Sequence, residues 1–447
     1  MYLLLIKQFV RSRISVVALV LLLVMGVISI LIGKQFLMKQ EQTIFKVAEH
    51  QRMHIGRNVA AYDEMGLLLY YLRFSLISKP DKLAAMSIGQ RDVNPGIQSV
   101  TLRTLEAQKY DTDLTNPVQL QSGNLDLGFV IIYLFPLVII AFTFNLFSED
   151  NESGTWKLIS VQSKSAVRFL LAKFSVRALF VYGMLITLFL LAALVLSLPL
   201  TGSFAAFIAV SVLYIAFWFV LCFWVSMFKC SSGFNVLTLL TIWVTLTVLL
   251  PAAVNNLVAS VYPVPEALST IVKQRDGYHK KWDVDKKVTM EKFYAHYPQF
   301  SIYGIPEDNF WAWYYAMQQM GDDESLNDSR AMREKLLQRE KLSRTLAVAI
   351  PTMHAQMNLN DLAQTGLSDY LRLLDSAATF HERMRLYFYP RIFDKTSPKE
   401  EDWAKFQPEF LPPRCGLNWL SMVLPFIAVT GLLIWWALFR AKKLYTV

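Results

Sequence analysis

Six long apolar segments constrain the fold of this chain more than any other feature of its sequence. They cover residues 15–32, 127–146, 178–200, 204–228, 234–259 and 417–439, and none contains Asp, Glu, Lys or Arg. A helix needs about 20 apolar residues to cross the roughly 30 Å hydrocarbon core of a bilayer. Hydrophobic residues make up 54% of the chain, above the range of about 45–50% that is usual for soluble domains. We therefore predict an all-α polytopic membrane protein with six transmembrane helices.

The charges between these segments predict the orientation of the chain. If both termini are cytoplasmic, the cytoplasmic pieces contain 12 of the 44 Lys/Arg but only 3 of the 35 Asp/Glu, and the remaining charges cancel. Lys and Arg are enriched on the cytoplasmic side of membrane proteins. We therefore expect a multi-pass protein of the cell inner (cytoplasmic) membrane with both termini cytoplasmic. The basic pI of about 9.2 then reflects the excess of Lys and Arg on the cytoplasmic side. It does not indicate a nucleic-acid partner, and none is predicted.

This topology divides the chain into five parts. Both extracytoplasmic regions are large, and we expect them to be mainly helical, because prolines separate helical stretches at 266–294, 328–350 and 361–388 and no strand-like alternation stands out. The first membrane helix should continue to about residue 62, and residues 66–74 should pack on the outer membrane face or on the second region. The parts are residues 1–33 (interfacial segment and first span), 34–124 (first extracytoplasmic region), 125–260 (second to fifth spans), 261–415 (second extracytoplasmic region) and 416–447 (sixth span and cytoplasmic tail).

Two smaller expectations follow from the same topology. Residues 1–13 suit either a short helix in the inner interface or a simple basic flank, and these alternatives are equally favoured. The three cysteines fall in separate places, with Cys222 within a span, Cys230 cytoplasmic and Cys415 at the outer surface. No intrachain disulfide is therefore expected.

The cytoplasmic loop at residues 147–177 has the most distinctive pattern in the chain. An acidic cluster precedes Gly154, and the short amphipathic run from Trp156 to Gln162 follows it. Glycine readily adopts the left-handed backbone of a sharp turn. We therefore predict a helix leaving the membrane, a turn at Gly154, and a short helix that lies across the membrane face.

The order of these residues resembles the cytoplasmic loop of ABC-2 type transporter permeases, in the subfamily with large extracytoplasmic loops. Acidic residues, a Glu-x-Gly-Thr sequence at 152–155, an apolar turn, a serine break and a later Lys follow one another as in that family. Gln162 departs from it, because the family often has Pro there. Further residues that carry the resemblance are Asn116-Pro117, Gly123, Asp126, Phe129, Pro136-Leu137, residues 89–92 and residues 380–393.

The resemblance implies a function and a set of partners. It implies a membrane permease subunit of an ABC exporter, driven by a separate ABC ATPase dimer that carries ATP and Mg, and paired with a second permease subunit, identical or paralogous. In this family the loop at residues 149–162 is the coupling helix that contacts the ATPase. The residues that this assigns to ATPase coupling are Glu149, Glu152, Gly154, Thr155, Trp156, Leu158 and Ile159.

Absent motifs agree with an energy source on another chain. The sequence contains no G-x-x-x-x-G-K-[ST] phosphate-binding loop, no G-x-S-x-G, no H-E-x-x-H and no C-x-x-C. We therefore expect no enzyme activity, catalytic residue, cofactor or metal on this chain. Two alternatives remain open. One is an ABC mechanotransmission subunit that acts on an extracytoplasmic partner, and the other is a membrane scaffold or sensor that needs no ATPase.

The fifth apolar segment is unusually polar for a membrane helix. Its polar side chains either face a dimer interface or translocation pathway, or bond back to their own helix. The candidate pathway residues are Thr241, Thr245, Pro251, Asn255 and Asn256.

Three other clusters have two interpretations each. Glu49, His50 and His54 suit either a metal pair or a solvated helix face, and residues 353–357 suit either Cu(I) binding or methionine packing. The aromatic run at 310–315 suits either a stacking surface or packing against the other extracytoplasmic region. For all three we favour the structural interpretation.

Overall fold

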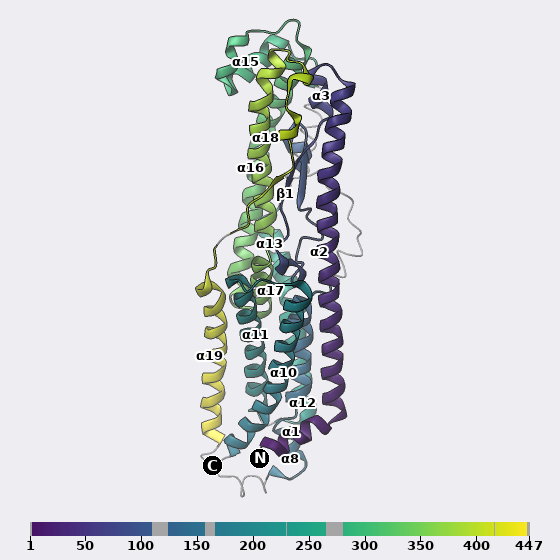
Figure 1. Cartoon of the computed structure of the whole chain (residues 1–447). Helices are drawn as coiled ribbons and strands as arrows, with labels where there is room; N and C mark the ends of the chain where they lie inside the picture. Colours follow the sequence, from purple (N-terminus) through teal and green to yellow (C-terminus); the bar gives the residue numbers. More distant parts are fainter. Residues whose placement is uncertain are drawn as a thin grey trace.

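The computed structural model describes residues 2–109, 124–156, 166–228, 230–264, 280–414 and 416–444. The molecule is elongated, with a helical bundle at one end and a second helical body, here called the cap (described residues 34–109 and 280–414), at the other (Figure 1). Among the described residues, six helices are long and apolar enough to cross a membrane, which confirms the predicted membrane-protein class. They are Arg13–Ala61, Leu127–Glu152, Phe169–Leu196, Gly202–Ser226, Ser232–Val261 and Trp419–Ala437.

The longest helix, α2 (Arg13–Ala61), connects the two bodies. Its 49 residues correspond to about 74 Å at 1.5 Å per residue, and it runs from the bundle to the far end of the cap (Figure 1). The prediction that the first membrane helix continues to about residue 62 is confirmed. A separate helix α1 (Tyr2–Arg11) lies across the base, where the Phe9 ring stacks on Phe180 at 4.7 Å between centroids. Residues 2–11 thus form a helix and not a simple basic flank.

The centre of the bundle is formed by the second and fourth spans. The second consists of α6 (Leu127–Phe129), a π-helical turn at Val130–Leu134 and α7 (Phe135–Thr143), and the fourth is α11 (Gly202–Ser226). Pro136 has no N–H, so the carbonyl of Ile132 loses its usual helical donor. The Tyr214 hydroxyl donates to that carbonyl at 2.8 Å. A neighbouring helix therefore satisfies the backbone group that the proline frees.

The remaining spans lie around this centre. They are α10 (Ala166–Leu196), the combination of α12 (Ser232–Val244), a second π-helical turn at Thr245–Leu249 and α13 (Leu250–Val261), and α19 (Trp419–Leu444).

The cap combines helices with a small mixed sheet. The strand order is β2-β1-β3, with β1 antiparallel to β2 and parallel to β3, and Phe74 lies opposite Val100. The cap is mainly helical, as predicted, but the sequence did not indicate this sheet. All four residues of β1 are buried, so the apolar and polar alternation that identifies a half-exposed strand is missing. The elements of the first cap segment are α3 (Met65–Tyr71), β1 (Phe74–Ile77), the 3-10 helix η1 (Lys82–Ala85), β2 (Ile97–Val100) and α4 (Leu105–Lys109).

The second cap segment contains long helices whose ends differ from the predicted ones. The helix predicted at 328–350 begins earlier, at Phe310, because the Asn309 side chain caps it by accepting from the Ala312 N–H at 3.1 Å. The helix predicted at 361–388 is divided, because a turn at Thr365–Gly366 separates two helices. The segment contains α15 (Lys286–His296), η4 (Pro298–Tyr303), α16 (Phe310–Ala347), α17 (Pro351–Leu362), α18 (Leu367–Phe393), η5 (Pro398–Glu400), η6 (Trp403–Lys405) and β3 (Glu409–Phe410).

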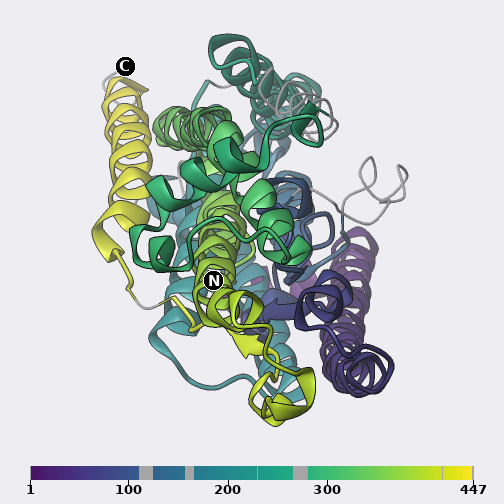
Figure 2. The same cartoon turned by 90° about the horizontal axis from the view of Figure 1, so that it is seen from above.

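The two cap segments are interleaved, and Figure 2 shows the second segment lying beside α2 when the molecule is seen from above. The Tyr315 hydroxyl donates to the Gly66 carbonyl at 2.9 Å, and the Trp311 indole donates to Glu64 at 2.7 Å. Residues 66–74 thus pack on the second region, and the aromatic run at 310–315 is packing and not a free stacking surface.

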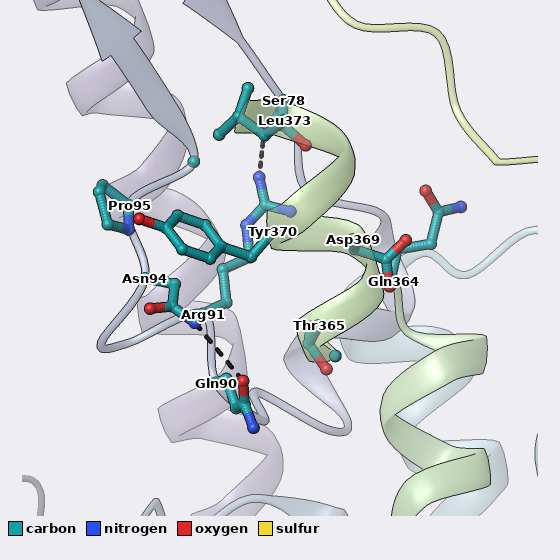
Figure 3. A pocket seen from close by; sticks show the side chains of 12 residues that line it. Ser78, Gln90, Arg91, Asn94, Pro95, Gln364, Thr365, Asp369, Tyr370 and Leu373 are labelled. Carbon is teal, nitrogen blue, oxygen red and sulfur yellow. Dashed lines mark hydrogen bonds between the residues drawn. The ribbon is translucent and has the colours of Figure 1, made fainter. Parts of the chain in front are cut away.

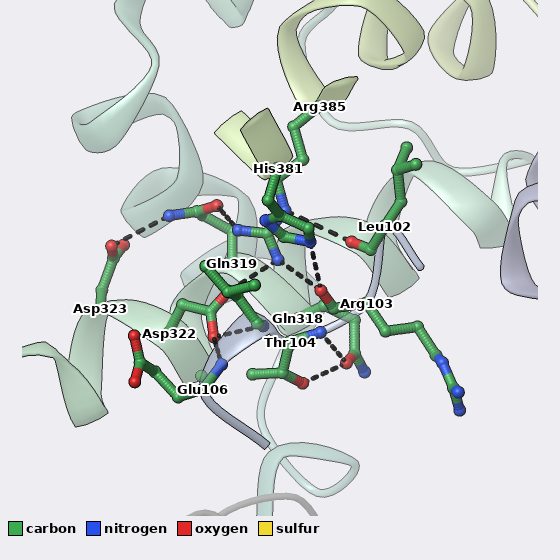
Figure 4. Close-up of polar contacts among 12 residues, drawn as sticks. Leu102, Arg103, Thr104, Glu106, Gln318, Gln319, Asp322, Asp323, His381 and Arg385 are labelled. Carbon is green, nitrogen blue, oxygen red and sulfur yellow. Dashed lines mark hydrogen bonds and ion pairs between the residues drawn. The ribbon is translucent and has the colours of Figure 1, made fainter. Parts of the chain in front are cut away.

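A buried polar network fastens the loop after β2 between α16 and α18 (Figure 4). Arg385 is only 2% exposed and contacts Asp322 at 2.8 Å, and Asp322 also accepts from the Leu105 N–H at 2.9 Å. The His381 ring nitrogen Nε2 lies 2.9 Å from the carbonyl of Arg103. Burial lowers the pKa of His381 well below its usual value, so this histidine is neutral and donates a hydrogen bond.

Candidate functional site

The loop that the sequence singles out lies at the end of the bundle farthest from the cap (Figure 1). It begins with the short helix α8 (Ser148–Glu152), and Gly154 follows with a φ of +73°. This is the left-handed turn that the sequence predicted. No atom lies near the position where a Cβ would be added, so the requirement for glycine is conformational and not steric. The Thr155 hydroxyl donates to the Asp150 carbonyl at 3.2 Å and closes the turn.

The acidic side chains of this loop bind to the chain itself. Lys173 on α10 donates to Asp150 at 2.6 Å, and Asn145 donates to Glu149 at 2.9 Å. The carboxylate of Asp150 is mostly buried against Lys173, while Glu149 remains exposed.

Glu152 connects the loop to the start of the fifth span. Its carboxylate accepts from the backbone N–H of Ser232 at 2.7 Å and from the Ser232 hydroxyl at 2.9 Å. A carboxylate at a helix N-terminus satisfies free N–H groups and interacts favourably with the helix dipole. Ser148 adds a second contact, because its hydroxyl lies 2.7 Å from the Ser232 hydroxyl. Sequence reasoning missed these contacts, since partners 80 residues apart in the chain share no local pattern.

Trp156 is half-buried in a small apolar cluster. Its ring meets the Phe147 ring edge-on at 4.6 Å between centroids, next to Leu146, Leu170 and Met227. The flanking spans supply this cluster, so the indole is partly buried against them. Leu158 and Ile159, which were also assigned to ATPase coupling, lie outside the described residues.

The candidate pathway residues lie on the fifth span. Only 11% of the residues in its most apolar stretch are buried within the chain. The hydroxyl of Thr241 donates to the Leu237 carbonyl, and that of Thr245 donates to the Thr241 carbonyl, both at 2.8 Å. Both threonines therefore bond back to their own helix, as the structural interpretation predicted. Asn255 and Asn256 are exposed, and Pro251 is the second residue of α13, which follows the second π-helical turn.

The second span contacts the base of the cap at the end that lies away from the α8 loop. Asp126 caps α6 by accepting from the Phe129 N–H at 2.7 Å, and it also accepts from the Ile88 N–H at 2.7 Å. The next residue of that cap loop, Gly89, has a φ of +55°, and an added Cβ would lie 2.9 Å from the Thr365 carbonyl oxygen. Only glycine fits here. We call this contact region, formed by Asp126, residues 87–91 and Thr365, the junction.

A small cavity of about 20 Å³ lies beside the junction (Figure 3). Arg91 donates to the Ser78 carbonyl on one side of it. On the other side, Asp369 is 6% exposed, and neither of its carboxylate oxygens has a hydrogen-bond partner within the described residues. Burial raises the pKa of Asp369. An unsatisfied buried carboxyl group thus lies beside the junction, which the sequence did not indicate.

The sequence raised metal binding as one interpretation of residues 49–54 and 353–357. Over the described ranges, no group of three His, Cys, Asp or Glu side chains could hold a metal ion. His354 is buried and its Nε2 lies 3.0 Å from the Met422 carbonyl, which is a structural contact. Cys222 and Cys230 are both free, and Cys415 lies outside the described residues.

The fold therefore defines a mainly helical protein with six candidate membrane spans and a large cap. Comparison with protein families finds one match, in which residues 267–411 fit a family described as a domain of unknown function, DUF3526. The matched residues span the cap helices α15 to α18 and β3, and cover less than half of the chain. No curated protein and no solved structure matches the chain.

Proposed function

We propose that this chain is the membrane permease subunit of an ABC exporter, driven by a separate ATPase that carries ATP and Mg. The observation that carries the proposal is the turn from α8 through Gly154 to Trp156. It presents an exposed glutamate and a partly buried tryptophan at the end of the bundle opposite the cap. Tryptophan is a common anchor at protein interfaces.

The hydrogen bonds of this loop connect it to two other spans. Asp150 accepts from Lys173 on the third span, and Glu152 accepts from Ser232 at the start of the fifth. A displacement of the turn by a bound ATPase would therefore act on three spans together. The second span, which leads into α8, extends to the junction at its other end, where Asp126 holds the cap loop. Movement at the ATPase would thus reach the base of the cap.

The proposal includes a second permease subunit and a membrane orientation. In the most apolar stretches of the fifth and sixth spans, 11% and 17% of the residues are buried within the chain. The corresponding share is 61% in the second and fourth spans. Their free faces suit lipid or a paired subunit, identical or paralogous. The excess of Lys/Arg in the sequence at the α8 end places that end, with both termini, in the cytoplasm.

A mechanotransmission subunit that acts on an extracytoplasmic partner is the second candidate. Two observations favour it. Helix α2 runs without a break from the bundle to the far end of the cap, and the junction fixes the second span to the cap through backbone hydrogen bonds. Both features would carry motion to the cap without a substrate crossing the bilayer.

Co-purification tests the association with an ATPase, which both candidate functions require. The full-length chain, purified from its native membrane, should carry an ATPase whose Mg-ATP hydrolysis elutes with it. Trp156→Ala should weaken that association about 30-fold, since truncating an interface tryptophan often costs about 2 kcal/mol. Trp435→Ala is the matched control, because Trp435 is a tryptophan on the sixth span that is 68% exposed.

Trp156→Ala also removes the contact with Phe147, so the thermal stability of each variant must be measured in parallel. A stable Trp156→Ala protein that keeps its full complement of ATPase would refute the coupling role. Purification with no ATPase under any condition would favour a scaffold or sensor instead.

Orientation is tested by labelling single cysteines in intact cells. A cysteine-free chain with Gln90→Cys or Asn151→Cys suits this, because both positions are exposed, and position 90 lies in the junction at the base of the cap while position 151 lies in α8 at the other end of the second span. An impermeant maleimide should label position 90 and not position 151. The reverse result would invert the proposed topology.

A further inference from the structure

A groove of about 420 Å³ lies in the cap between helix α2 and the sheet. One wall is formed by Lys46, His50 and His54 of α2, and the other by Arg73, Ser75 and Ser99. Figure 1 shows α2 running beside β1 at this level of the cap. None of the residues used in the proposed ATPase coupling or at the junction lines the groove.

The floor of the groove is held rigidly. Ser75 and Ser99 are cross-strand partners in β1 and β2, and their hydroxyls lie 2.8 Å apart. Gln51 of α2 is buried beneath them, where it accepts from the Ser75 N–H at 2.9 Å and donates to the Phe406 carbonyl at 2.9 Å. The α2 wall and the sheet wall are therefore fixed to each other, so the groove is formed before any ligand binds.

The groove has a strongly one-sided charge pattern. Four basic side chains line it, and no carboxylate is among the described residues that do so. The rings of His50 and His54 stack with 5.9 Å between centroids, which is the arrangement that the sequence allowed for a metal pair. Lys46 and Arg73 would repel a cation there, and no acidic ligand is present to offset them. The geometry therefore favours an anion.

The charges around His54 make its protonation sensitive to a bound anion. Burial lowers the pKa of His54, and so do the positive charges of His50, Arg57 and Arg73 around it. A bound anion would counteract these three neighbours and raise the pKa again. Binding would then take up a proton, so affinity should increase as the pH falls from about 8 towards about 6.

The position of the groove indicates where its ligand comes from. The first apolar segment ends at residue 32, and Lys46 and His54 lie 14 and 22 residues farther along the same helix. At 1.5 Å per residue this is about 21–33 Å beyond the apolar segment. The groove is out of reach of lipid headgroups in the bilayer, so the ligand must come from the aqueous phase.

We propose that this groove binds a small, water-soluble multivalent anion that carries phosphate or carboxylate groups. Arg73 and Lys46 supply the charge, the two histidines add charge when protonated, and the Ser75–Ser99 hydroxyl pair, in which one hydroxyl donates to the other, leaves one hydroxyl proton to donate at the floor. This inference does not depend on the proposed transporter function. It would hold equally for a scaffold or sensor.

Isothermal titration of the full-length protein in detergent tests the proposal, with inorganic pyrophosphate and citrate as the two probes. At least one should bind with one-to-one stoichiometry, about tenfold more tightly at pH 6 than at pH 8. Arg73→Gln and His54→Gln should each weaken binding about tenfold or more, since hydrogen bonds to charged groups contribute about 1.5–3 kcal/mol. Lys39→Gln is the control, because Lys39 is an exposed lysine of α2 that does not line the groove.

The two probes also distinguish the chemical source. Binding of pyrophosphate alone would assign a phosphate ligand, and binding of citrate alone would assign a carboxylate ligand. If Arg73→Gln is unstable, His50→Gln replaces it, because His50 is exposed. The proposal is overturned if neither probe binds at pH 6, if Lys39→Gln weakens binding as much as the groove variants, or if Zn²⁺ binds His50 and His54 more tightly than either anion.

Discussion

The cap and the α8 loop both depend on ion pairs and hydrogen bonds, but these contacts have different surroundings. In the cap, Arg385 and Asp322 are enclosed by α16, α18 and the loop after β2. In the α8 loop, the Glu149 and Glu152 carboxylates are exposed, whereas the ion pair of Asp150 with Lys173 is mostly buried. Buried charged contacts are costly to break, whereas exposed ones contribute little. The cap is therefore expected to be a rigid body, and the α8 loop to be a weakly held one that a partner can move.

The largest effect is expected where the cap network loses its cation. Arg385→Ala leaves the Asp322 carboxylate buried without its partner, which should lower the free energy of unfolding by about 3–5 kcal/mol. Arg383→Ala is the matched control on the same helix, because its ion pair with Glu409 is exposed, and it should cost less than about 1 kcal/mol. Thermal unfolding and limited proteolysis of the cap measure both. Equal effects of the two variants would contradict the contrast between buried and exposed pairs.

The junction should respond to pH because burial raises the pKa of Asp126 to about 6. A carboxyl whose pKa is higher in the folded state than in the unfolded chain stabilises the fold at low pH, and this contribution is lost as the pH rises through about 6. The stability of the wild-type chain relative to Asp126→Asn should therefore increase by roughly 1–3 kcal/mol as the pH falls from about 7 to about 4. Unfolding midpoints of the two proteins across this range measure the difference.

If the difference in stability between wild type and Asp126→Asn stays constant across this pH range, the carboxyl of Asp126 is already ionised in the fold. Asp126→Ala adds a second comparison, because it leaves the N–H groups of Ile88 and Phe129 without their acceptor. An unsatisfied buried donor costs about 1–3 kcal/mol.

A smaller effect is expected at the turn of the α8 loop. Gly154→Ala places a Cβ in the left-handed region, which costs roughly 1 kcal/mol, although the space around it is open. The change should loosen the α8 loop and reduce ATPase association while the unfolding of the cap is unchanged. Gly183→Ala is the control, because Gly183 lies within α10 and also has open space around it. Loss of cap stability in Gly154→Ala would show that the two regions are not independent.

The smallest effect is expected on the fifth span. The Thr241 hydroxyl bonds to its own helix, so Thr241→Val should change stability by less than about 0.5 kcal/mol. The same variant also tests whether Thr241 lines the pathway. A hydroxyl that bonds only to its own helix is not needed for transport, so Thr241→Val should leave transport-coupled ATP hydrolysis unchanged. A clear loss of hydrolysis in Thr241→Val would instead place Thr241 in the pathway.

The sequence by itself determined the membrane class and the local turn at Gly154. An apolar segment of about 20 residues can satisfy its backbone in a bilayer only as a helix or within a closed barrel, so length and composition decide the outcome. The continuation of α2 beyond the bilayer was also predictable, because helical spacing of apolar residues persists there. Gly154 could be predicted because the left-handed backbone selects glycine locally.

Only the tertiary structure decided which distant residues meet. The strand β1 was missed because it is buried on both faces and shows no alternation, and the break between α17 and α18 depends on the cap loop that binds Thr365. The contacts of Glu152 with Ser232 and of Asp126 with Ile88 join residues 80 and 38 positions apart. Such pairs depend on how the helices pack, and hydrophobic periodicity specifies the buried face of a helix but not the neighbour that covers it.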